Sequence, residues 1–291
     1  MRDQYQVTLY DPADVDAFSG DPDELYWTLD GLTPADNPTA RIESISTSGR
    51  FIEVTVRGDA SLMIRYRESD AADIHHVDEA DILAAHQAIM ACLSRAHEWR
   101  QALDPISGSF RTADLRIDYQ QTGLSTANAM LDNLKRRQRR NLPKVVPPTI
   151  LWGSRTITTG DTWHGVPGSG KVAVRILRPD RVHEHGIAIF APGGTLTVGP
   201  AQSARETVIW PTADTAEIVV DYIAPAQTLQ VCNVYMVRNG TSERVDRWSE
   251  NAGMVIEPAG ELERIYHCNH ASTAPPGFAD LMFSLRLLAG S

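Results

Sequence analysis

Cysteine and lysine are scarce in this chain. Its 291 residues contain three cysteines, Cys92, Cys232 and Cys268, which lie far apart and are odd in number. A small secreted disulfide scaffold has a denser, even set, so the cysteines favour a reducing compartment. Lysine occurs only at positions 135, 144 and 171, and arginine supplies the rest of the 27 basic residues. This bias is typical of high-GC bacterial or phage genomes.

Long hydrophobic runs are also missing from the sequence. No apolar stretch approaches the roughly 20 residues that a membrane-spanning helix needs. The N-terminal segment MRDQYQVTLYDPADVD has an early arginine but no apolar core of a signal peptide. We therefore expect no membrane partner, and either a cytoplasmic location or incorporation into a particle that is assembled in the cytoplasm.

The chain has fewer basic than acidic residues. The formal net charge is −10, with 37 acidic against 27 basic residues. This balance argues against a nucleic-acid partner, because the phosphate backbone favours a basic footprint. A hydrophobic fraction of 42% is ordinary for a globular protein. At this length we expect two domains, each with a core of its own.

Alternating apolar residues predict strands early in the chain. QYQVTLY reads as an opening strand, and RFIEVTVRGDASLMIRYRE, from residue 50 to 68, predicts a β-hairpin with one buried face. The Gly58-Asp59 pair supplies the turn of this hairpin.

Two helices are predicted in the same part of the chain. Apolar residues three or four positions apart over 82–96 predict an amphipathic helix with Asp78 as its N-cap. STANAMLDNLKRRQRRN predicts a second helix, capped by Ser125 or Thr126. We therefore expect residues 1–141 to form an α+β domain with a β-hairpin and two helices.

Past residue 141 the helical pattern ends. Residues 142–148, LPKVVPP, contain three prolines and are typical of a linker. About ten short β-rich stretches follow, separated by Gly, Pro and Asn turns. Nine of them can be delimited: KVAVRIL, GIAIF, TLTV, ETVIW, EIVVDYI, LQVCNVYMV, GMVIE, LERIYHC and LMFSLRLL. This pattern predicts an all-β C-terminal domain over 149–291, an antiparallel β-sandwich of jelly-roll-like architecture.

The segment GVPGSGKV, residues 165–172, matches the G-x-x-x-x-G-K spacing of a phosphate-binding loop. Such a loop needs a helix after it, so that backbone N–H groups at the helix N-terminus bind phosphate. The following KVAVRILRP alternates and is β-branched, and Val172 stands where a Ser or Thr would bind magnesium. We therefore expect a turn between two strands here.

Four histidines of the β-rich half are candidate metal ligands: His183, His185, His267 and His270. Imidazole nitrogens suit zinc or iron, and ligands from neighbouring strands can converge on one ion. Carboxylates at Asp246, Glu250 and Asp280 would suit calcium instead. Against these readings, loop histidines and turn carboxylates are usually solvated, so we expect no cofactor and keep a divalent metal as an alternative.

Aromatic residues of the β-rich half are candidate contacts for a ligand or partner. Trp163, Trp210 and Trp248 lie beside predicted loops, and exposed rings can stack on sugars or anchor a protein partner. The alternative is that the rings fill the core of the sandwich, which is the commoner fate of tryptophan.

One dense basic run stands out in the acidic chain. LKRRQRRNLPK contains Arg136, Arg137, Arg139 and Arg140, which could bind an acidic protein partner, including another copy of this chain. The alternative is structural, because cations at a helix C-terminus stabilise its dipole and arginine stems cover apolar surface.

No complete catalytic motif is present, and we assign no catalytic residue. The sequence favours a non-enzymatic binding or assembly protein, a virion or appendage component or a partner-binding factor, that uses its β-sandwich for recognition. A protein partner or a homo-oligomer follows from this hypothesis. Two alternatives remain: a metal-dependent enzyme or small-ligand binder with the histidine cluster, and a carbohydrate-binding β-sandwich.

Overall fold

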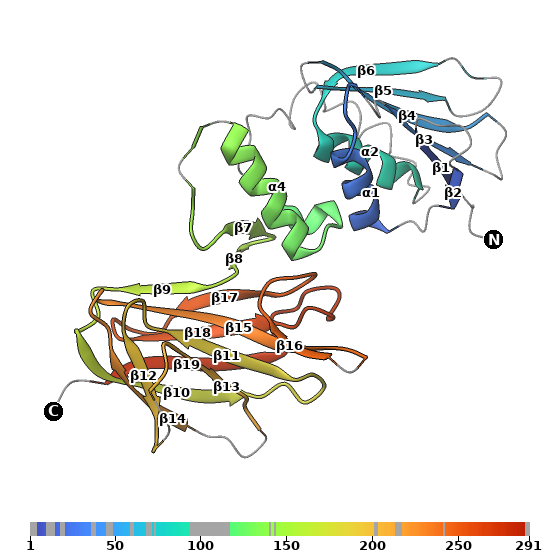
Figure 1. Ribbon diagram of the computed structural model, residues 1–291. Helices are drawn as coiled ribbons and strands as arrows, with labels where there is room; N and C mark the ends of the chain where they lie inside the picture. Colours follow the sequence, from blue (N-terminus) through green and yellow to red (C-terminus); the bar gives the residue numbers. More distant parts are fainter. Residues whose placement is uncertain are drawn as a thin grey trace. The chain divides into compact units, whose positions relative to one another are not determined.

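The computed structural model describes most of the chain, which is drawn in Figure 1. The described residues are 5–9, 15–17, 21–35, 39–44, 49–58, 61–67, 72, 74–93, 117–139, 141–142, 144–200, 203–212, 217–240 and 242–288. The chain divides into an N-terminal unit, Met1–Ile117 with Gln121–Leu124, and a C-terminal unit, Asp118–Gln120 with Ser125–Ser291. It is a mostly β protein, in which an antiparallel sheet with helices precedes two further antiparallel sheets.

The N-terminal unit contains a six-stranded antiparallel sheet with the order β2-β1-β3-β4-β5-β6. Its strands are β1 (Tyr5–Leu9), β2 (Val15–Ala17), β3 (Thr39–Ser44), β4 (Phe51–Val56), β5 (Leu62–Arg67) and β6 (His75–Ala80). Its helices are α1 (Pro22–Asp30) and α2 (Ile82–Leu93). Leu25 and Leu29 of α1 and Ile89 of α2 share one buried cluster with Val54 and Ile64 of the sheet, so both helices cover the same sheet face.

The β4–β5 hairpin confirms the clearest sequence prediction. Val54 pairs with Ile64 and Val56 with Leu62, and these alternating residues are all buried. Since successive side chains of a strand point to opposite faces, the alternation in the sequence directly fixed this buried face.

The start of α2 differs from the prediction. We expected Asp78 as the N-cap, but residues 75–80 form β6, which pairs with β5. The helix begins at Ile82, and the Ala84 N–H donates to Asp81 Oδ1 at 2.8 Å. Residues whose side chains could cap a helix therefore form a strand instead, because they pair with β5. Helix α1 was not predicted, although Asp21 caps it by accepting from the Asp23 N–H at 2.8 Å.

The C-terminal unit begins with a short 3-10 segment and one helix. Residues Tyr119–Thr122 form the 3-10 turn η2, and Thr126–Arg139 form α4, the helix predicted from STANAMLDNLKRRQRR. Ser125 precedes it as the cap, since the Asn128 N–H donates to Ser125 Oγ. The structure groups α4 with the strands that follow it, whereas the domain boundary at 142–148 stays a prediction.

Two antiparallel sheets make up the rest of the C-terminal unit. The eight-stranded sheet has the order β12-β14-β10-β19-β18-β17-β8-β7, and the five-stranded sheet has the order β13-β11-β15-β16 with β9 paired to β15. The strands are β7 (Thr149–Trp152), β8 (Arg155–Thr158), β9 (Asp161–His164), β10 (Ser169–Arg178), β11 (His185–Phe190), β12 (Thr195–Val198), β13 (Glu206–Ile209), β14 (Glu217–Ile223), β15 (Thr228–Asn239), β16 (Ser242–Asp246), β17 (Gly253–Pro258), β18 (Glu263–Asn269) and β19 (Leu281–Leu288).

One hydrophobic core serves both sheets of this unit. Its buried cluster includes Ile187 and Val231 of the five-stranded sheet together with Val172, Tyr266 and Phe283 of the eight-stranded sheet. The nine β-rich runs from KVAVRIL to LMFSLRLL all form strands, while β7, β8, β9 and β16 were not predicted. The glycine-rich segment, residues 165–172, forms the turn after β9 and the first residues of β10. Lys171 pairs with Asp221 of β14, so no phosphate-binding helix follows the segment.

A buried hydrogen-bonded group links α4 to the 3-10 turn. Asp132 Oδ2 accepts from the Tyr119 hydroxyl at 2.7 Å and from Arg136 Nε at 2.6 Å. The side chains of Arg136 and Asp132 are only 3% and 5% exposed.

Replacing Asp132 by alanine should therefore destabilise the C-terminal unit by about 3 kcal/mol or more, since one partner of a buried ion pair is removed. Urea unfolding followed by circular dichroism measures this loss. Arg139→Ala, at an exposed position of the same helix, should change the unfolding free energy by less than about 0.5 kcal/mol. Equal effects of the two substitutions would contradict the prediction.

Candidate functional site

Three of the four candidate histidines come together at one end of the C-terminal core. The His183 and His270 rings are stacked, with centroids 4.1 Å apart and planes 8° from parallel. His185 meets His270 edge-on at 5.4 Å, and so does Tyr235 at 5.0 Å. These side chains come from the segment before β11, from β11 and β15, and from the segment after β18.

Asp180 holds two of the imidazoles in place. Its Oδ2 lies 3.2 Å from His183 Nδ1 and 3.3 Å from His185 Nδ1, and its Oδ1 accepts from the Val182 and His183 N–H groups. Because an ionised carboxylate only accepts, both rings donate from Nδ1. His185 Nε2 is then left to accept from Asn233 Nδ2 at 3.2 Å.

These contacts stabilise the charge on Asp180. Burial alone raises the pKa of this carboxyl, but hydrogen bonds from His185 and from the Val182 and His183 N–H groups outweigh burial. The pKa of Asp180 is therefore held well below its usual range, and the group is a fixed anion rather than a proton donor at neutral pH.

Whereas Asp180 is held in its charged form, His270 is held as a neutral ring. Burial, together with the neighbouring His183 and His185, lowers the pKa of His270 from 6.5 to about 4. The Ser272 N–H donates to His270 Nδ1 at 3.2 Å, which places the proton of the neutral ring on Nε2. Asp280 fixes the backbone here, since its Oδ2 accepts from the His270 N–H at 2.8 Å.

Asn269 organises the segment that carries His270. Its Nδ2 donates to the carbonyl oxygens of Asn251, His270 and Thr273 at 2.9 to 3.0 Å. Its Oδ1 accepts from the N–H groups of Gly277 and Phe278. The side chain is fully buried, so one amide connects the end of β18 with the loop that leads to β19.

The geometry of this cluster does not form a metal site. Among the described residues, no group of three or more His, Cys, Asp and Glu side chains could hold a metal ion. Parallel stacked rings direct their nitrogens side by side rather than toward one point, whereas a tetrahedral ion needs converging ligands. The fourth candidate, His267, lies apart and pairs with Glu257 at 3.2 Å. Of the calcium candidates, Asp246 accepts from the Arg247 N–H.

The three candidate tryptophans have different environments. Trp163 is 3% exposed; its Nε1 donates to the Tyr266 hydroxyl at 2.7 Å, and the Arg264 guanidinium covers its ring at 4.2 Å. Trp163 therefore belongs to the core and has no open face for a sugar or partner. Trp210 and Trp248 are 36% and 37% exposed, so both rings remain candidate contacts.

The basic run is partly structural. Arg136 is 3% exposed and pairs with Asp132, so it does not present its charge to a partner. Arg137 is half-buried and Arg139 is exposed on α4. Arg140, the last candidate of the run, lies outside the described residues.

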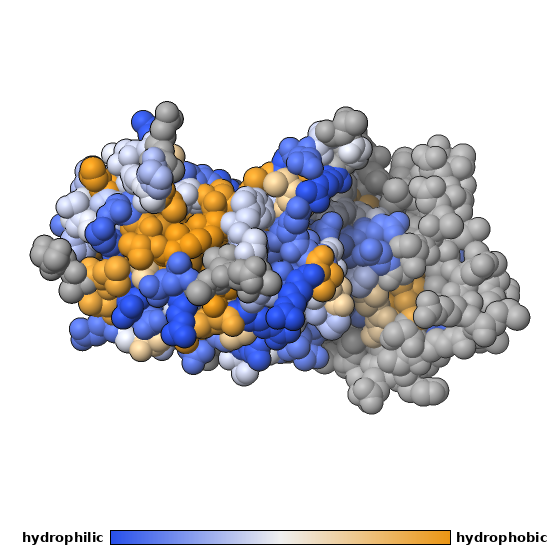
Figure 2. Space-filling model, turned by 90° about the horizontal axis from the view of Figure 1, so that it is seen from below, coloured by the Kyte–Doolittle hydropathy of each residue, from blue (hydrophilic) through white to orange (hydrophobic). Residues whose placement is uncertain are grey.

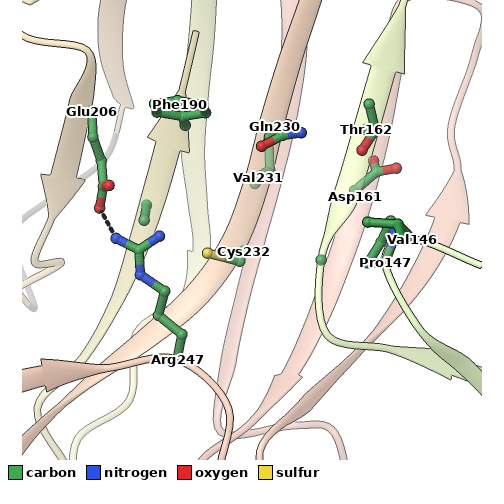
Figure 3. A pocket seen from close by; sticks show the side chains of 12 residues that line it. Val146, Pro147, Asp161, Thr162, Phe190, Glu206, Gln230, Val231, Cys232 and Arg247 are labelled. Atoms are coloured by element: carbon green, nitrogen blue, oxygen red, sulfur yellow. Dashed lines mark hydrogen bonds and ion pairs between the residues drawn. The ribbon is translucent and has the colours of Figure 1, made fainter. Parts of the chain in front are cut away.

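A cavity of about 270 Å³ lies on the outer face of the five-stranded sheet. The small residues Ala188, Cys232 and Gly160 form part of its lining, together with Phe190 and Pro147. Figure 3 shows Arg247 and Glu206 on one side of the cavity, Asp161 and Thr162 on the other, and the Cys232 sulfur between them. The cavity was not predicted from the sequence, although the alternation in GIAIF and LQVCNV places Ala188, Phe190 and Cys232 on the face opposite the core.

The five-stranded sheet exposes apolar residues around this cavity. Trp210 packs on Gly186, where a Cβ would lie 2.8 Å from the indole ring, and Val245 of β16 is 42% exposed. Val245 pairs with Met236 of β15, on the same face as Cys232. The apolar surface therefore extends from β13 across to β16.

A second apolar patch lies elsewhere on the C-terminal unit. Figure 2 views the molecule from below and shows hydrophobic side chains gathered in a patch that hydrophilic residues border. β10 and β14 lie low in Figure 1 and carry the exposed Leu177, Val219 and Ile223. The groove on this sheet is polar, since Lys171 and Asp221 form an ion pair in it.

Comparison with known proteins found no relative of this chain. No protein family model, no curated protein and no solved structure matches this chain. Among the described residues, no helix is both long and apolar enough to cross a membrane.

The folded protein is expected to lose stability as the pH falls from about 6.5 to about 4, in part through His270. In this window the unfolded chain takes up a proton on His270 that the folded chain excludes, so acid favours unfolding. His270→Gln should flatten the pH dependence of the urea midpoint, whereas His164→Gln, at an exposed position of β9 outside the cluster, should leave it unchanged. An unchanged slope in His270→Gln would contradict this account.

Proposed function

We propose that this chain is a non-enzymatic binding or assembly protein that recognises a protein partner through its C-terminal unit. We further propose that this unit is a β-sandwich of jelly-roll-like architecture. Support for the sandwich comes from the single buried cluster to which both sheets contribute. The observation that carries the binding function is the apolar outer face of the five-stranded sheet, with its cavity at Ala188 and Cys232.

An apolar outer face is unusual for a sheet that already buries its other face. Antiparallel sheets with one face on a core normally turn polar side chains to water, and larger exposed apolar patches mark interaction sites. Here Trp210 and Val245 are exposed on the outer face, and aromatic residues are enriched at the energetic centres of interfaces.

The outer face of the eight-stranded sheet can be compared with that of the five-stranded sheet. There Lys171 and Asp221 form an ion pair, and Arg286 lies opposite Glu263. An ion pair, Arg247 with Glu206, also lies on the outer face of the five-stranded sheet, so charge pairs do not distinguish the two faces. Val219 and Ile223 are exposed on β14. The five-stranded sheet combines exposed apolar side chains with an apolar cavity, so it is the better candidate for recognition.

Neither alternative function has comparable support. A metal-dependent enzyme would need imidazole nitrogens that converge on one ion, whereas the stacked rings of His183 and His270 direct their nitrogens in parallel. For carbohydrate binding, burial of Trp163 leaves Trp210 and Trp248 as the only rings of that proposal that are exposed.

Photo-crosslinking in the native host tests the proposed function. p-Benzoylphenylalanine replaces Val245 on β16 or, in the matched variant, Ile223 on β14, and both positions are exposed. We expect one discrete protein adduct from position 245 and none from position 223. The adduct mass distinguishes a second copy of this chain from another protein.

Two results would overturn the proposal. Illumination that gives no adduct from either position would remove the protein partner. An adduct from position 223 alone would assign recognition to the eight-stranded sheet instead. Circular dichroism of both variants shows that the fold is retained before the crosslinks are compared.

A further inference from the structure

The cavity on the five-stranded sheet is built into paired strands. Ala188 of β11 lies opposite Cys232 of β15 and also opposite Val208 of β13. Short side chains at these outward positions leave space between the larger Phe190 and Pro147. Because the floor belongs to three hydrogen-bonded strands, the cavity is preformed rather than opened by a ligand.

The volume of the cavity limits what it can hold. Apolar cavities of about 150 Å³ bind benzene, and this cavity measures about 270 Å³. One aromatic group of one or two rings fits this space. Phe190 contributes a ring to the lining, and Val146 and Pro147 contribute aliphatic side chains (Figure 3), so the cavity offers both aromatic and aliphatic surface to such a group.

The charges around the cavity are already paired. Arg247 forms an ion pair with Glu206 on one side. On the other side Asp161 accepts from Arg264 Nη1 and from the Tyr266 hydroxyl, each at 2.7 Å. A charged occupant would have to disrupt one of these pairs, so charge complementarity favours a neutral group.

The polar groups that remain in the cavity include acceptors for a donor on the ligand. Glu206 binds Arg247 through Oε1, so its Oε2 can accept from a ligand. The Thr162 hydroxyl and the Gln230 side-chain amide also line the cavity, and both can accept a hydrogen bond. A neutral aromatic group with one N–H or O–H donor therefore matches both the surface and the polar rim.

We propose that the cavity binds a neutral aromatic side chain with a hydrogen-bond donor, tryptophan or tyrosine, that a partner protein inserts. This inference rests on the proposed function, since it names the group that the partner presents to the same sheet face. Such anchors in desolvated pockets supply most of the energy of many interfaces. Exposed Val146 and half-buried Pro147, at the edge of the cavity, then contact the partner around the inserted ring.

Cys232 provides a reporter inside the cavity for testing this proposal. Its thiol lines the cavity and is partly exposed, whereas Cys268 is fully buried. Iodoacetamide labelling of the full-length protein at about pH 8.5, read by peptide mass spectrometry, follows Cys232 alone. This pH compensates for the pKa of the Cys232 thiol, which burial raises.

Millimolar indole and p-cresol are expected to slow the labelling of Cys232 at least fivefold. 1-Methylindole lacks the N–H donor and should protect about tenfold more weakly, which corresponds to the loss of one hydrogen bond to a charged acceptor. Ala188→Leu fills the floor and should abolish protection by indole. The matched control Thr197→Leu, on the outer side of β12 in the other sheet, should leave protection unchanged.

Several outcomes would overturn the proposal. Labelling of Cys232 that indole and p-cresol leave unchanged would exclude an aromatic occupant, and equal protection by indole and 1-methylindole would remove the donor requirement. If Ala188→Leu does not fold, the two indoles still test the proposal on the wild-type protein. Protection by indole without any crosslink from position 245 would show a cavity for free aromatic ligands and overturn the partner as its source.

Discussion

The pairing of β11 with β15 positions both the histidine cluster and the cavity. In this register His185 lies opposite Tyr235, and Ala188 lies opposite Cys232. The first pair points inward and meets His270 at the end of the core. The second pair points outward and forms the floor of the cavity. Since strand side chains alternate between faces, a slip of one residue would exchange the two sets, so the register is a precondition for both sites.

The inward set is polar, and the fold accommodates it through hydrogen bonds. Asp180 accepts from two backbone N–H groups and two imidazoles, and Asn269 uses both atoms of its amide. Buried polar groups are tolerated when they are paired in this way. Within this set of described residues, Asn233 Oδ1 is a buried acceptor with no hydrogen-bond partner. Asn233 donates to both His185 and Asn269, so its orientation is fixed by its donors.

The strands of the C-terminal unit could largely be predicted because their pattern is local. Runs such as KVAVRIL alternate over enough residues that burial of one face is the main explanation of the sequence. The short strands β7, β8, β9 and β16 carry too few alternating residues for the same argument. Residues 75–80 show the competing effect: acidic groups suited to cap a helix became an edge strand because β5 offers backbone partners.

The sequence showed which residues have side chains suited to a functional site, but not which of them lie together. The four histidines were found by spacing, yet only tertiary structure separates His267 from the other three. The tryptophans were found by composition, while burial of Trp163 depends on Tyr266 and Arg264, which lie about a hundred residues away in the sequence. The cavity could not be predicted from the sequence. Small side chains indicate a cavity only when their neighbours on the adjacent strands are known.

By itself the sequence determined that the chain forms a mostly β protein with helices in its first half, and which face of the longer strands is buried. Those properties depend on residues close in the chain, whose spacing reflects backbone geometry. Only the tertiary structure decided which imidazoles meet, which arginine is buried and where an outer sheet face is hollow. Each of these depends on contacts between residues that are distant in sequence, and strand register, rather than local pattern, brings such residues together.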